Sequence, residues 1–149
     1  MSTNPTTPEG FHTLTPMLCV ADAIGAIRFY ERVFDATVTA RHDEVGGKVS
    51  NATLAIGDSL LMLSDEFSEH SREHASEGWP RSPKTLRGSS GSLYVYVSDA
   101  EAVFARAEAE GVRVISPVRD REWGDHVGSF EDPFGHIWNV ATYVGRLPH

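Results

Sequence analysis

A four-residue pattern occurs twice in this chain, and the interval between its copies constrains the fold more than any other feature. Val20-Ala-Asp-Ala and Val97-Ser-Asp-Ala share the pattern Val-x-Asp-Ala at an offset of 77 residues, from position 20 to position 97. The same offset carries Ile27 onto Phe104. An internal repeat defines an architecture before any single motif does. We therefore predict two copies of one structural unit.

Each copy has the pattern of a strand, a helix and three further strands. Asp22 and Asp99 are residues that cap helix N-termini, and apolar residues recur behind Asp22 at helical spacing. Helices are therefore predicted over residues 23–34 and 100–110. Alternating or apolar runs predict strands at residues 11–20, 36–42, 48–56, 59–64, 92–97, 112–115, 128–130 and 136–143. The predicted fold class is α+β: two βαβββ repeats, about residues 14–64 and 92–143, forming a mixed sheet curled around a cavity. A ferredoxin-like α+β domain is the alternative.

The length of 149 residues fits a single domain. Residues 1–12, rich in Thr and Pro, are expected to form a flexible tail, and residues 13–149 the domain. Residues 65–91 are polar and are expected to form a long surface connection between the repeats.

Composition excludes several classes of protein. The formal net charge is −8 and no basic stripe is present, which argues against nucleic acid as a partner. No apolar stretch approaches the roughly 20 residues of a membrane helix, and the start lacks the pattern of a signal peptide. Cys19 is the only cysteine, so an internal disulfide is excluded, as is a zinc site built from several thiolates. We expect a cytoplasmic protein with no membrane partner.

Five segments together resemble one superfamily. They are PMLCVADA at residues 16–23, FYERVF at 29–34, IGDSLLMLSDE at 56–66, WGD at 123–125 and DPFGHIW at 132–138. The combination resembles the vicinal oxygen chelate superfamily of glyoxalases, extradiol dioxygenases, and fosfomycin and bleomycin resistance proteins. The WGD and DPFGHxW motifs are similar to those of its PhnB-like branch. The resemblance implies the two-repeat fold and leaves the reaction open, because one fold hosts unrelated activities.

The resemblance also indicates where a metal site would lie. Catalytic relatives hold a divalent ion with four side chains, at positions that correspond here to Thr15, Met62, Ser92 and Asn139. Relatives with metal carry His, Gln or Glu there, whereas this chain has two hydroxyls, a thioether and an amide. Such neutral groups bind divalent ions poorly. We therefore expect no metal and no cofactor at this place.

Strand parity extends these positions to the rest of the predicted cavity. Side chains alternate between the two faces of a strand, so Met17, Cys19, Tyr94 and Tyr96 are expected to share the face of Thr15 and Ser92. The predicted ligand-binding residues are Thr15, Met17, Met62, Ser92, Tyr94, Tyr96, Trp123 and Asn139. An apolar, aromatic lining with few polar groups is typical of a small-molecule pocket, and a filled core is the alternative.

Two neighbouring residues are the candidate acid/base groups. Asp125 and His126 follow Trp123, and a carboxylate beside an imidazole can orient the ring and shift its pKa. A structural role for Asp125 in a turn is the alternative. His136 and Trp138 are expected to be structural, and so is Cys19, since no histidine lies at a fixed spacing from it.

The connection contains a histidine pair and a tryptophan. His70 and His74 have the spacing of a zinc pair but lack a third ligand, so a solvated loop is favoured. Trp79 is expected either at the rim of the cavity or on the surface.

Three functions compete at this point. The first is a metal-free protein that sequesters or carries an aromatic or amphipathic small molecule, as drug-binding, antibiotic-resistance members of the superfamily do. The second is a metal-free isomerase, cyclase or lyase that uses His126, Asp125 or a cavity tyrosine. The third is a metal-dependent lyase or dioxygenase with displaced ligands. The long connection would also allow two chains to exchange repeats, so we expect a homodimer.

Overall fold

The structure is a computed structural model that describes residues 5–68, 72–73 and 77–145. The first repeat contains β1 (Met17–Val20), α1 (Ala23–Phe34), β2 (Thr37–Asp43), β3 (Val49–Ile56) and β4 (Ser59–Asp65). The short helix α3 (Pro83–Leu86) lies in the connection. The second repeat contains β5 (Ser92–Tyr96), α4 (Ala100–Ala109), β6 (Arg113–Asp120), β7 (Asp125–Glu131) and β8 (Ile137–Tyr143).

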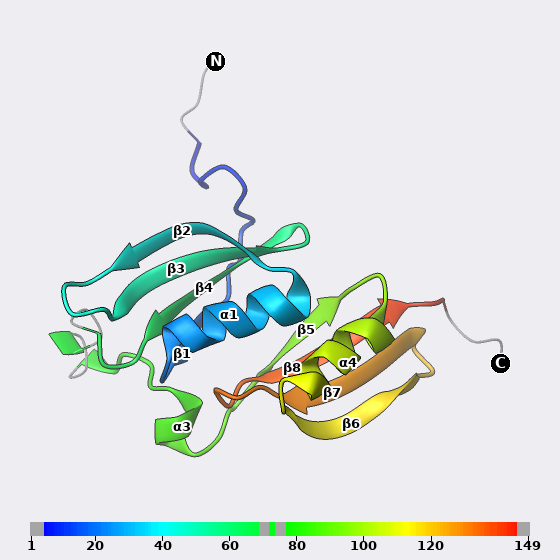
Figure 1. Cartoon of the computed structure of the whole chain (residues 1–149). Helices are drawn as coiled ribbons and strands as arrows, with labels where there is room; N and C mark the ends of the chain where they lie inside the picture. The colour runs from blue at the N-terminus through cyan, green and yellow to red at the C-terminus, as the bar shows by residue number, and fades with distance from the viewer. Residues whose placement is uncertain (1–4, 69–71, 74–76, 146–149) are drawn as a thin grey trace.

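Each repeat forms a four-stranded mixed sheet. The strand orders are β1-β4-β3-β2 and β5-β8-β7-β6. The first strand of each repeat pairs in parallel with the last, and the remaining pairs are antiparallel. This identical topology, visible in Figure 1, confirms the prediction of two βαβββ repeats in an α+β fold.

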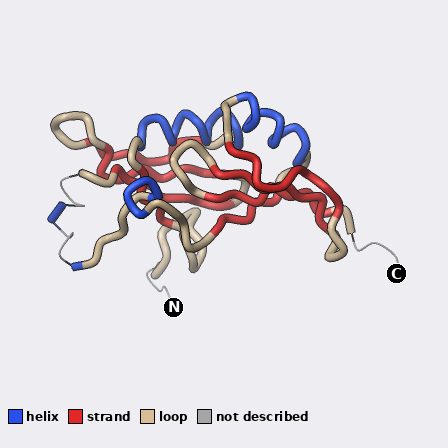
Figure 2. The backbone as a smooth tube through the Cα atoms, turned by 90° about the horizontal axis from the view of Figure 1, so that it is seen from below, coloured by secondary structure: helices blue, strands red, loops and turns tan. Residues whose placement is uncertain are grey.

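Both long helices cover the same side of the sheets. Figure 2 shows α1 and α4 in one layer above the strands. The predicted N-caps are confirmed, since the Asp22 carboxylate accepts from the backbone N–H of Gly25 at 3.0 Å and Asp99 accepts from that of Ala102 at 3.1 Å. These carboxylates satisfy backbone donors that have no partner within the first helical turn. The face of the sheets that lies away from α1 and α4 is here called the open face.

The two repeats share one hydrophobic core. Aromatic rings from α1 pack against rings from the second repeat: the centres of Phe34 and Trp138 lie 4.5 Å apart and those of Phe29 and Phe130 lie 6.3 Å apart. All four side chains are buried. Edge-to-face and tilted contacts of this kind add to the free energy that burial alone provides. The chain is therefore one packed unit.

A buried carboxylate stands at the centre of this shared core. One oxygen of Asp132 accepts from the hydroxyl of Tyr30 at 2.5 Å and from the indole N–H of Trp138 at 2.9 Å. Its other oxygen accepts from the backbone N–H groups of Phe134 and His136 at 2.9 and 3.0 Å. A buried charge is tolerated when its hydrogen-bonding capacity is filled in this way. Asp132 thus joins α1 to the turn before β8.

Other polar contacts cross between the repeats. The His136 ring nitrogen Nε2 lies 2.9 Å from the carbonyl oxygen of Cys19, and the Arg106 guanidinium donates to the carbonyl of Val33 at 2.9 Å. His136 and Trp138 thus have the structural placement that the sequence suggested.

The connection between the repeats is more firmly anchored than a polar surface loop. Asp65 ends β4 and accepts from the backbone N–H groups of Ala23 and Val49, both at 2.8 Å. The carboxylate of Glu66, 1% exposed, accepts from the backbone and hydroxyl of Ser82 and from the hydroxyl of Thr85 at 2.7 to 3.1 Å. The sequence missed these contacts because carboxylates in a polar run are usually solvated. His70 and His74 lie outside the described residues.

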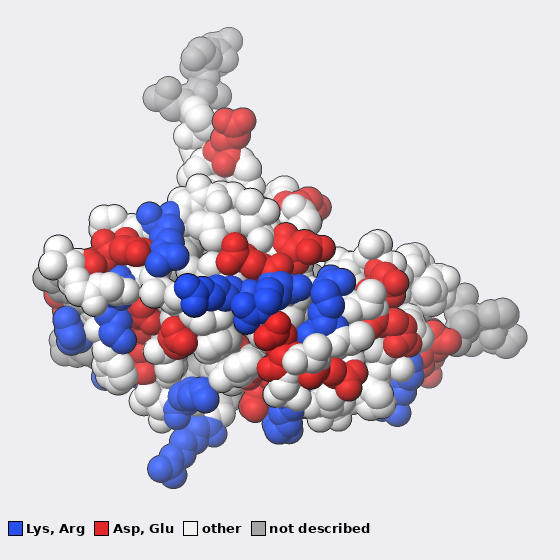
Figure 3. All heavy atoms as spheres, viewed as in Figure 1, with Lys and Arg blue, Asp and Glu red and all other residues white. Residues whose placement is uncertain are grey.

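The helix-covered face carries both charge signs. Figure 3 shows Lys and Arg side chains beside Asp and Glu side chains on the side drawn in Figure 1. Arg32 pairs with Glu110 at 2.7 Å and Arg113 with Glu131 at 3.1 Å. In the described part of the chain, no helix has the length and apolar character needed to cross a bilayer.

Candidate functional site

The open face of the second repeat holds a group of aromatic side chains around a carboxylate. Tyr94 and Tyr96 come from the edge strand β5, Asp125 begins β7, and Trp123 lies in the turn before it. Alternation along β5 turns both tyrosines to this face, while Leu93 and Val95 pack against the core. This group is called here the Asp125 cluster.

Three hydrogen bonds converge on one oxygen of Asp125. The hydroxyls of Tyr94 and Tyr96 donate to Oδ2 at 2.5 and 3.0 Å, and the indole N–H of Trp123 donates to it at 3.0 Å. The same indole N–H lies 3.2 Å from the hydroxyl oxygen of Tyr94. Asp125 is 1% exposed, whereas each aromatic residue is about half exposed. The carboxylate is therefore enclosed by the rings that it holds in place.

The Asp125 cluster keeps both tyrosines protonated. Partial burial and the hydrogen bond to Asp125 raise the pKa of Tyr94. The hydrogen bond to Asp125 raises the pKa of Tyr96. Both effects disfavour a second negative charge beside the carboxylate. The two rings lie 5.4 Å apart between centres at an interplanar angle of 49°, so they offer a fixed aromatic surface to solvent.

A pocket of about 390 Å³ adjoins the cluster at the seam between the repeats. Tyr94 and Tyr96 form part of one wall, and Thr15 and Pro16 form part of the other. Apolar side chains, including Ile56, Leu60, Leu93, Val95 and Trp138, line much of the rest. Volumes of roughly 300–1,000 Å³ are typical of small-molecule sites. The seam is open because β1 and β5 are edge strands of separate sheets.

The four positions that correspond to metal ligands in relatives form two pairs. In the second repeat, the Asn139 amide donates to the Ser92 hydroxyl at 2.9 Å and accepts from Ser129 at 2.7 Å. In the first repeat, Thr15 lies just before β1 and Met62 lies opposite Met17 in the sheet register. Of the four, only Thr15 lines the seam pocket. The two pairs belong to separate sheets, so the expectation that all four side chains face one cavity stays a prediction.

These groups do not suit a divalent metal. The Asn139 amide already uses its nitrogen and its oxygen in hydrogen bonds to neighbours, and none of the four side chains carries a charge that would offset the desolvation of a dication. In the described residues, no group of three His, Cys, Asp or Glu side chains is arranged to hold a metal ion.

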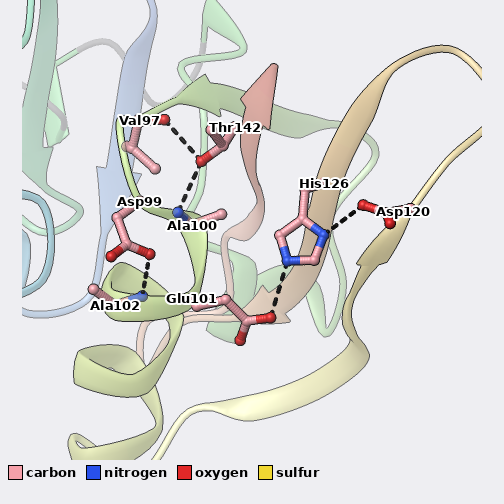
Figure 4. Close-up of polar contacts among 8 residues, drawn as sticks. All are labelled: Val97, Asp99, Ala100, Glu101, Ala102, Asp120, His126 and Thr142. Carbon is pink, nitrogen blue, oxygen red and sulfur yellow. Dashed lines mark hydrogen bonds and ion pairs between the residues drawn. The ribbon is translucent and has the colours of Figure 1, made fainter. Parts of the chain in front are cut away.

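His126 points away from the cluster, so the acid/base pair suggested by the sequence is not formed. Figure 4 shows its ring between Asp120 on β6 and Glu101 on α4, with Nδ1 and Nε2 at 2.8 and 2.9 Å from the two carboxylates. Consecutive residues of a strand face opposite sides, and Asp125 takes the open face. The two carboxylates raise the pKa of His126. This placement gives His126 a role in joining α4 to the sheet.

Cys19 and Trp79 lie at a smaller pocket of about 220 Å³ on the first repeat, beside Met17 and Ser64. Burial and the nearby carboxylates of Glu66 and Asp65 raise the pKa of the Cys19 thiol to about 11. The thiol is therefore protonated near neutral pH and is a poor nucleophile. Trp79 and Pro80 line this smaller pocket, which is separate from the seam pocket beside Tyr94 and Tyr96.

The sequence signals for the Asp125 cluster were incomplete. Tyr94 and Tyr96 were predicted for the open face, and the structure places them there. No local pattern indicates that the carboxylate of the WGD motif receives both hydroxyls, since β5 and β7 are separated by β8 in the sheet. A Tyr-x-Tyr strand in a chain with a WGD motif is the pattern that could have indicated it.

Comparison with known proteins gives a consistent result. The sequence profile described as Glyoxalase/Bleomycin resistance protein/Dioxygenase superfamily matches residues 11–140. An uncharacterized protein of Mycobacterium bovis is 35% identical over 134 residues, which cover 90% of this chain and 85% of that protein. An uncharacterized protein of Mycobacterium tuberculosis is also 35% identical, with 90% of this chain and 76% of that protein covered.

Solved structures show the same fold. A gene product of Arabidopsis thaliana is 27% identical with a TM-score of 0.61, covering 88% of this chain and 98% of that one. TioX from Micromonospora sp. ML1 is 23% identical with a TM-score of 0.64, covering 87% and 97%. A genomically encoded fosfomycin resistance protein from Listeria monocytogenes is 16% identical with a TM-score of 0.63, covering 91% and 94%. For TioX and the fosfomycin resistance protein, which are less than 25% identical to this chain, the likeness concerns the fold alone.

Proposed function

Because the chain belongs to the Glyoxalase/Bleomycin resistance protein/Dioxygenase superfamily, we propose that it binds an aromatic or amphipathic small molecule on its open face, without a metal. Its role would be sequestration or transport of that molecule in the cytoplasm. The WGD and DPFGHxW motifs support a place in the PhnB-like branch. The observation that carries the proposal is the Asp125 cluster, in which half-exposed rings are held rigid beside the seam pocket.

Fixed aromatic rings favour ligand binding for a physical reason. Hydrogen bonds from Tyr94, Tyr96 and Trp123 to one carboxylate restrict the rings before any ligand arrives. A preorganised surface loses less conformational entropy on binding than a mobile one. Large rings also supply most of the contact area in recognition sites.

Replacement of both tyrosines tests the proposal. The double variant Tyr94→Ala, Tyr96→Ala is expected to weaken an identified aromatic ligand by at least about tenfold, or roughly 1.4 kcal/mol. Calorimetric titration measures the affinity, and Val45→Ala, which removes an exposed apolar side chain in the turn between β2 and β3, is the control. Unchanged affinity in a folded double variant would contradict the proposal.

A homodimer is part of this proposal. Met17, Tyr96 and Tyr143 are 48%, 60% and 65% exposed, and exposed apolar side chains that lie close together can mark a surface for association. The long connection would also allow two chains to exchange repeats. Sedimentation velocity at micromolar concentration is expected to show a dimer, and a monomer would contradict this part.

One observation supports a second candidate function. The Tyr94 hydroxyl and the Asp125 carboxylate are 2.5 Å apart, a short charge-assisted hydrogen bond of the kind found between acid/base partners. A metal-free isomerase, cyclase or lyase could use this pair, whereas His126 lies on the other side of the sheet. Turnover of a bound compound, and its loss in Tyr94→Phe, would favour this function over simple binding.

Metal analysis separates both candidates from a metal-dependent enzyme. The neutral side chains at Thr15, Met62, Ser92 and Asn139 are expected to leave untagged protein with far less than one divalent ion per chain. Stoichiometric metal whose removal by a chelator abolishes activity would contradict this expectation.

A further inference from the structure

The geometry of the Asp125 cluster determines the direction in which its hydrogen bonds are donated. A tyrosine hydroxyl has one proton to donate and lone pairs to accept with. The hydroxyls of Tyr94 and Tyr96 both direct that proton to Asp125, at 2.5 and 3.0 Å. The only proton of the Trp123 indole nitrogen also points to this carboxylate, at 3.0 Å. All three donors are therefore turned inward.

The exposed side of the cluster consequently offers acceptors. Asp125 is 1% exposed, so a ligand meets the tyrosine oxygens and ring faces rather than the carboxylate. The Tyr94 oxygen already lies 3.2 Å from the Trp123 N–H, whereas the 60% exposed Tyr96 presents its oxygen to solvent. A ligand group that only accepts hydrogen bonds would face acceptors here and lose its own hydration without replacement.

We propose that the open-face site selects flat aromatic ligands that carry a hydrogen-bond donor, above all an ammonium group, and rejects carboxylates of the same shape. This inference rests on the proposed function and names the ligand class for the same site. An ammonium group donates charge-assisted hydrogen bonds to the tyrosine oxygens and lies favourably over electron-rich ring faces. The negative charge of Asp125 behind the hydroxyls acts in the same direction.

One neighbouring charge, that of Arg121, would favour an anionic ligand instead. The guanidinium carbon of Arg121 lies 5.5 Å from the centre of the Trp123 ring. Its stacking leaves one face of the indole covered and helps fix the ring with its N–H towards Asp125. An anionic ligand that reached Arg121 would be attracted to it. The binding measurements must therefore distinguish selection by Arg121 from selection by the Asp125 cluster.

Three probes that share the indole ring and differ only in the group at the end of a two-carbon linker isolate the effect of that group. Tryptamine carries an ammonium group, 3-propylindole a neutral methyl group and indole-3-propionate a carboxylate at the same place on one ring system. Titration of the full chain at pH 7, followed by the ¹⁵N NMR signal of the Trp123 indole, gives each Kd. We expect tryptamine to bind about tenfold or more tightly than indole-3-propionate, with 3-propylindole between them. Sodium chloride at about 0.5 M shortens the screening length to roughly 4 Å, which removes the long-range effect of the net charge.

Two variants assign the preference to the cluster. Asp125→Asn replaces the acceptor oxygen by an amide that can donate, which frees hydroxyl protons for the ligand. This variant is expected to reduce the ratio of the tryptamine affinity to the indole-3-propionate affinity to about one. Glu108→Gln on α4 removes the same charge from the helix-covered side and is expected to keep the ratio. If Asp125→Asn does not fold, Tyr96→Phe removes one acceptor and keeps the ring. It is expected to lower the ratio severalfold with unchanged 3-propylindole affinity.

The outcomes are distinguishable from failure of the proposed function. Binding of all three probes with equal affinity would overturn the inference and leave aromatic binding intact. Tighter binding of indole-3-propionate would also overturn it and indicate Arg121 as the selecting group. If none of the three probes binds, the proposed aromatic site is wrong, and so is the inference about its ligand class.

Discussion

Removal of one buried hydroxyl tests whether Asp132 holds the two repeats together. Tyr30→Phe keeps the aromatic ring in the shared core and deletes only the donor that lies 2.5 Å from Asp132. Tyr30 is fully buried, and burial together with the Asp132 carboxylate raises its pKa well above the ordinary value. The hydroxyl is therefore protonated near neutral pH and donates to the carboxylate.

The expected effect follows from the remaining partners of the carboxylate. Asp132 keeps the Trp138 indole and two backbone N–H groups, so it loses one of four donors. A hydrogen bond to a charged group contributes about 1.5–3 kcal/mol. We expect the free energy of unfolding to fall by about 2 kcal/mol, and for a chain of this size the melting temperature to fall by roughly 4–8 °C.

Urea denaturation followed by circular dichroism measures this difference. Tyr143→Phe is the matched control, because its ring is 65% exposed on β8 and surface substitutions usually change stability by less than about 0.5 kcal/mol. A Tyr30→Phe variant that is as stable as this control would refute the view of Asp132 as a link between the repeats.

Three further predictions concern other parts of the chain. Glu101 and Asp120 raise the pKa of His126, so the stabilising effect of His126 is complete below about pH 6.5 and is lost as the pH rises through the raised pKa. The melting temperature of the natural chain should exceed that of His126→Gln most at low pH, and a difference that does not depend on pH would contradict this. Gly128→Ala would place a Cβ atom 2.8 Å from both Phe104 and Val118 and should reduce the unfolding free energy by about 1–3 kcal/mol in urea titrations, whereas a neutral result would show that the core can adjust. With a pKa of about 11, Cys19 should react slowly with iodoacetamide at pH 7.5 and quickly in urea; equally fast labelling of the folded protein would disprove its protection.

Local patterns were sufficient to predict the elements of the fold. The N-caps Asp22 and Asp99 and the Val-x-Asp-Ala repeat located both helices, because capping and helical spacing are encoded within a few residues. Strands β6 and β7 proved longer than predicted. Pro117 lies within β6, which is an edge strand with a register shift between Ser116 and Arg119. Proline is tolerated in such places.

Contacts between distant segments could not be predicted in the same way. Strand parity was sufficient for the orientation of Tyr94 and Tyr96, since alternation is a local rule. Their shared acceptor was not predictable, because Asp125 lies about thirty residues away along the chain. His126 was misplaced for a related reason: its partner Glu101 belongs to α4, and a sequence does not show which helix lies over which strand.

The links between the repeats also determine how the chain must fold. Tyr30 and Asp132 are separated by 102 residues, and Cys19 and His136 by 117. Closing loops of this length costs entropy before any core contact compensates for it, and folding rates fall as the mean separation of contacts rises. Neither half can complete its core while the other is unstructured, since Phe34 and Trp138 pack on each other. The first repeat therefore lacks part of its core packing until the last strand is in place, and we expect both repeats to unfold together in one cooperative transition.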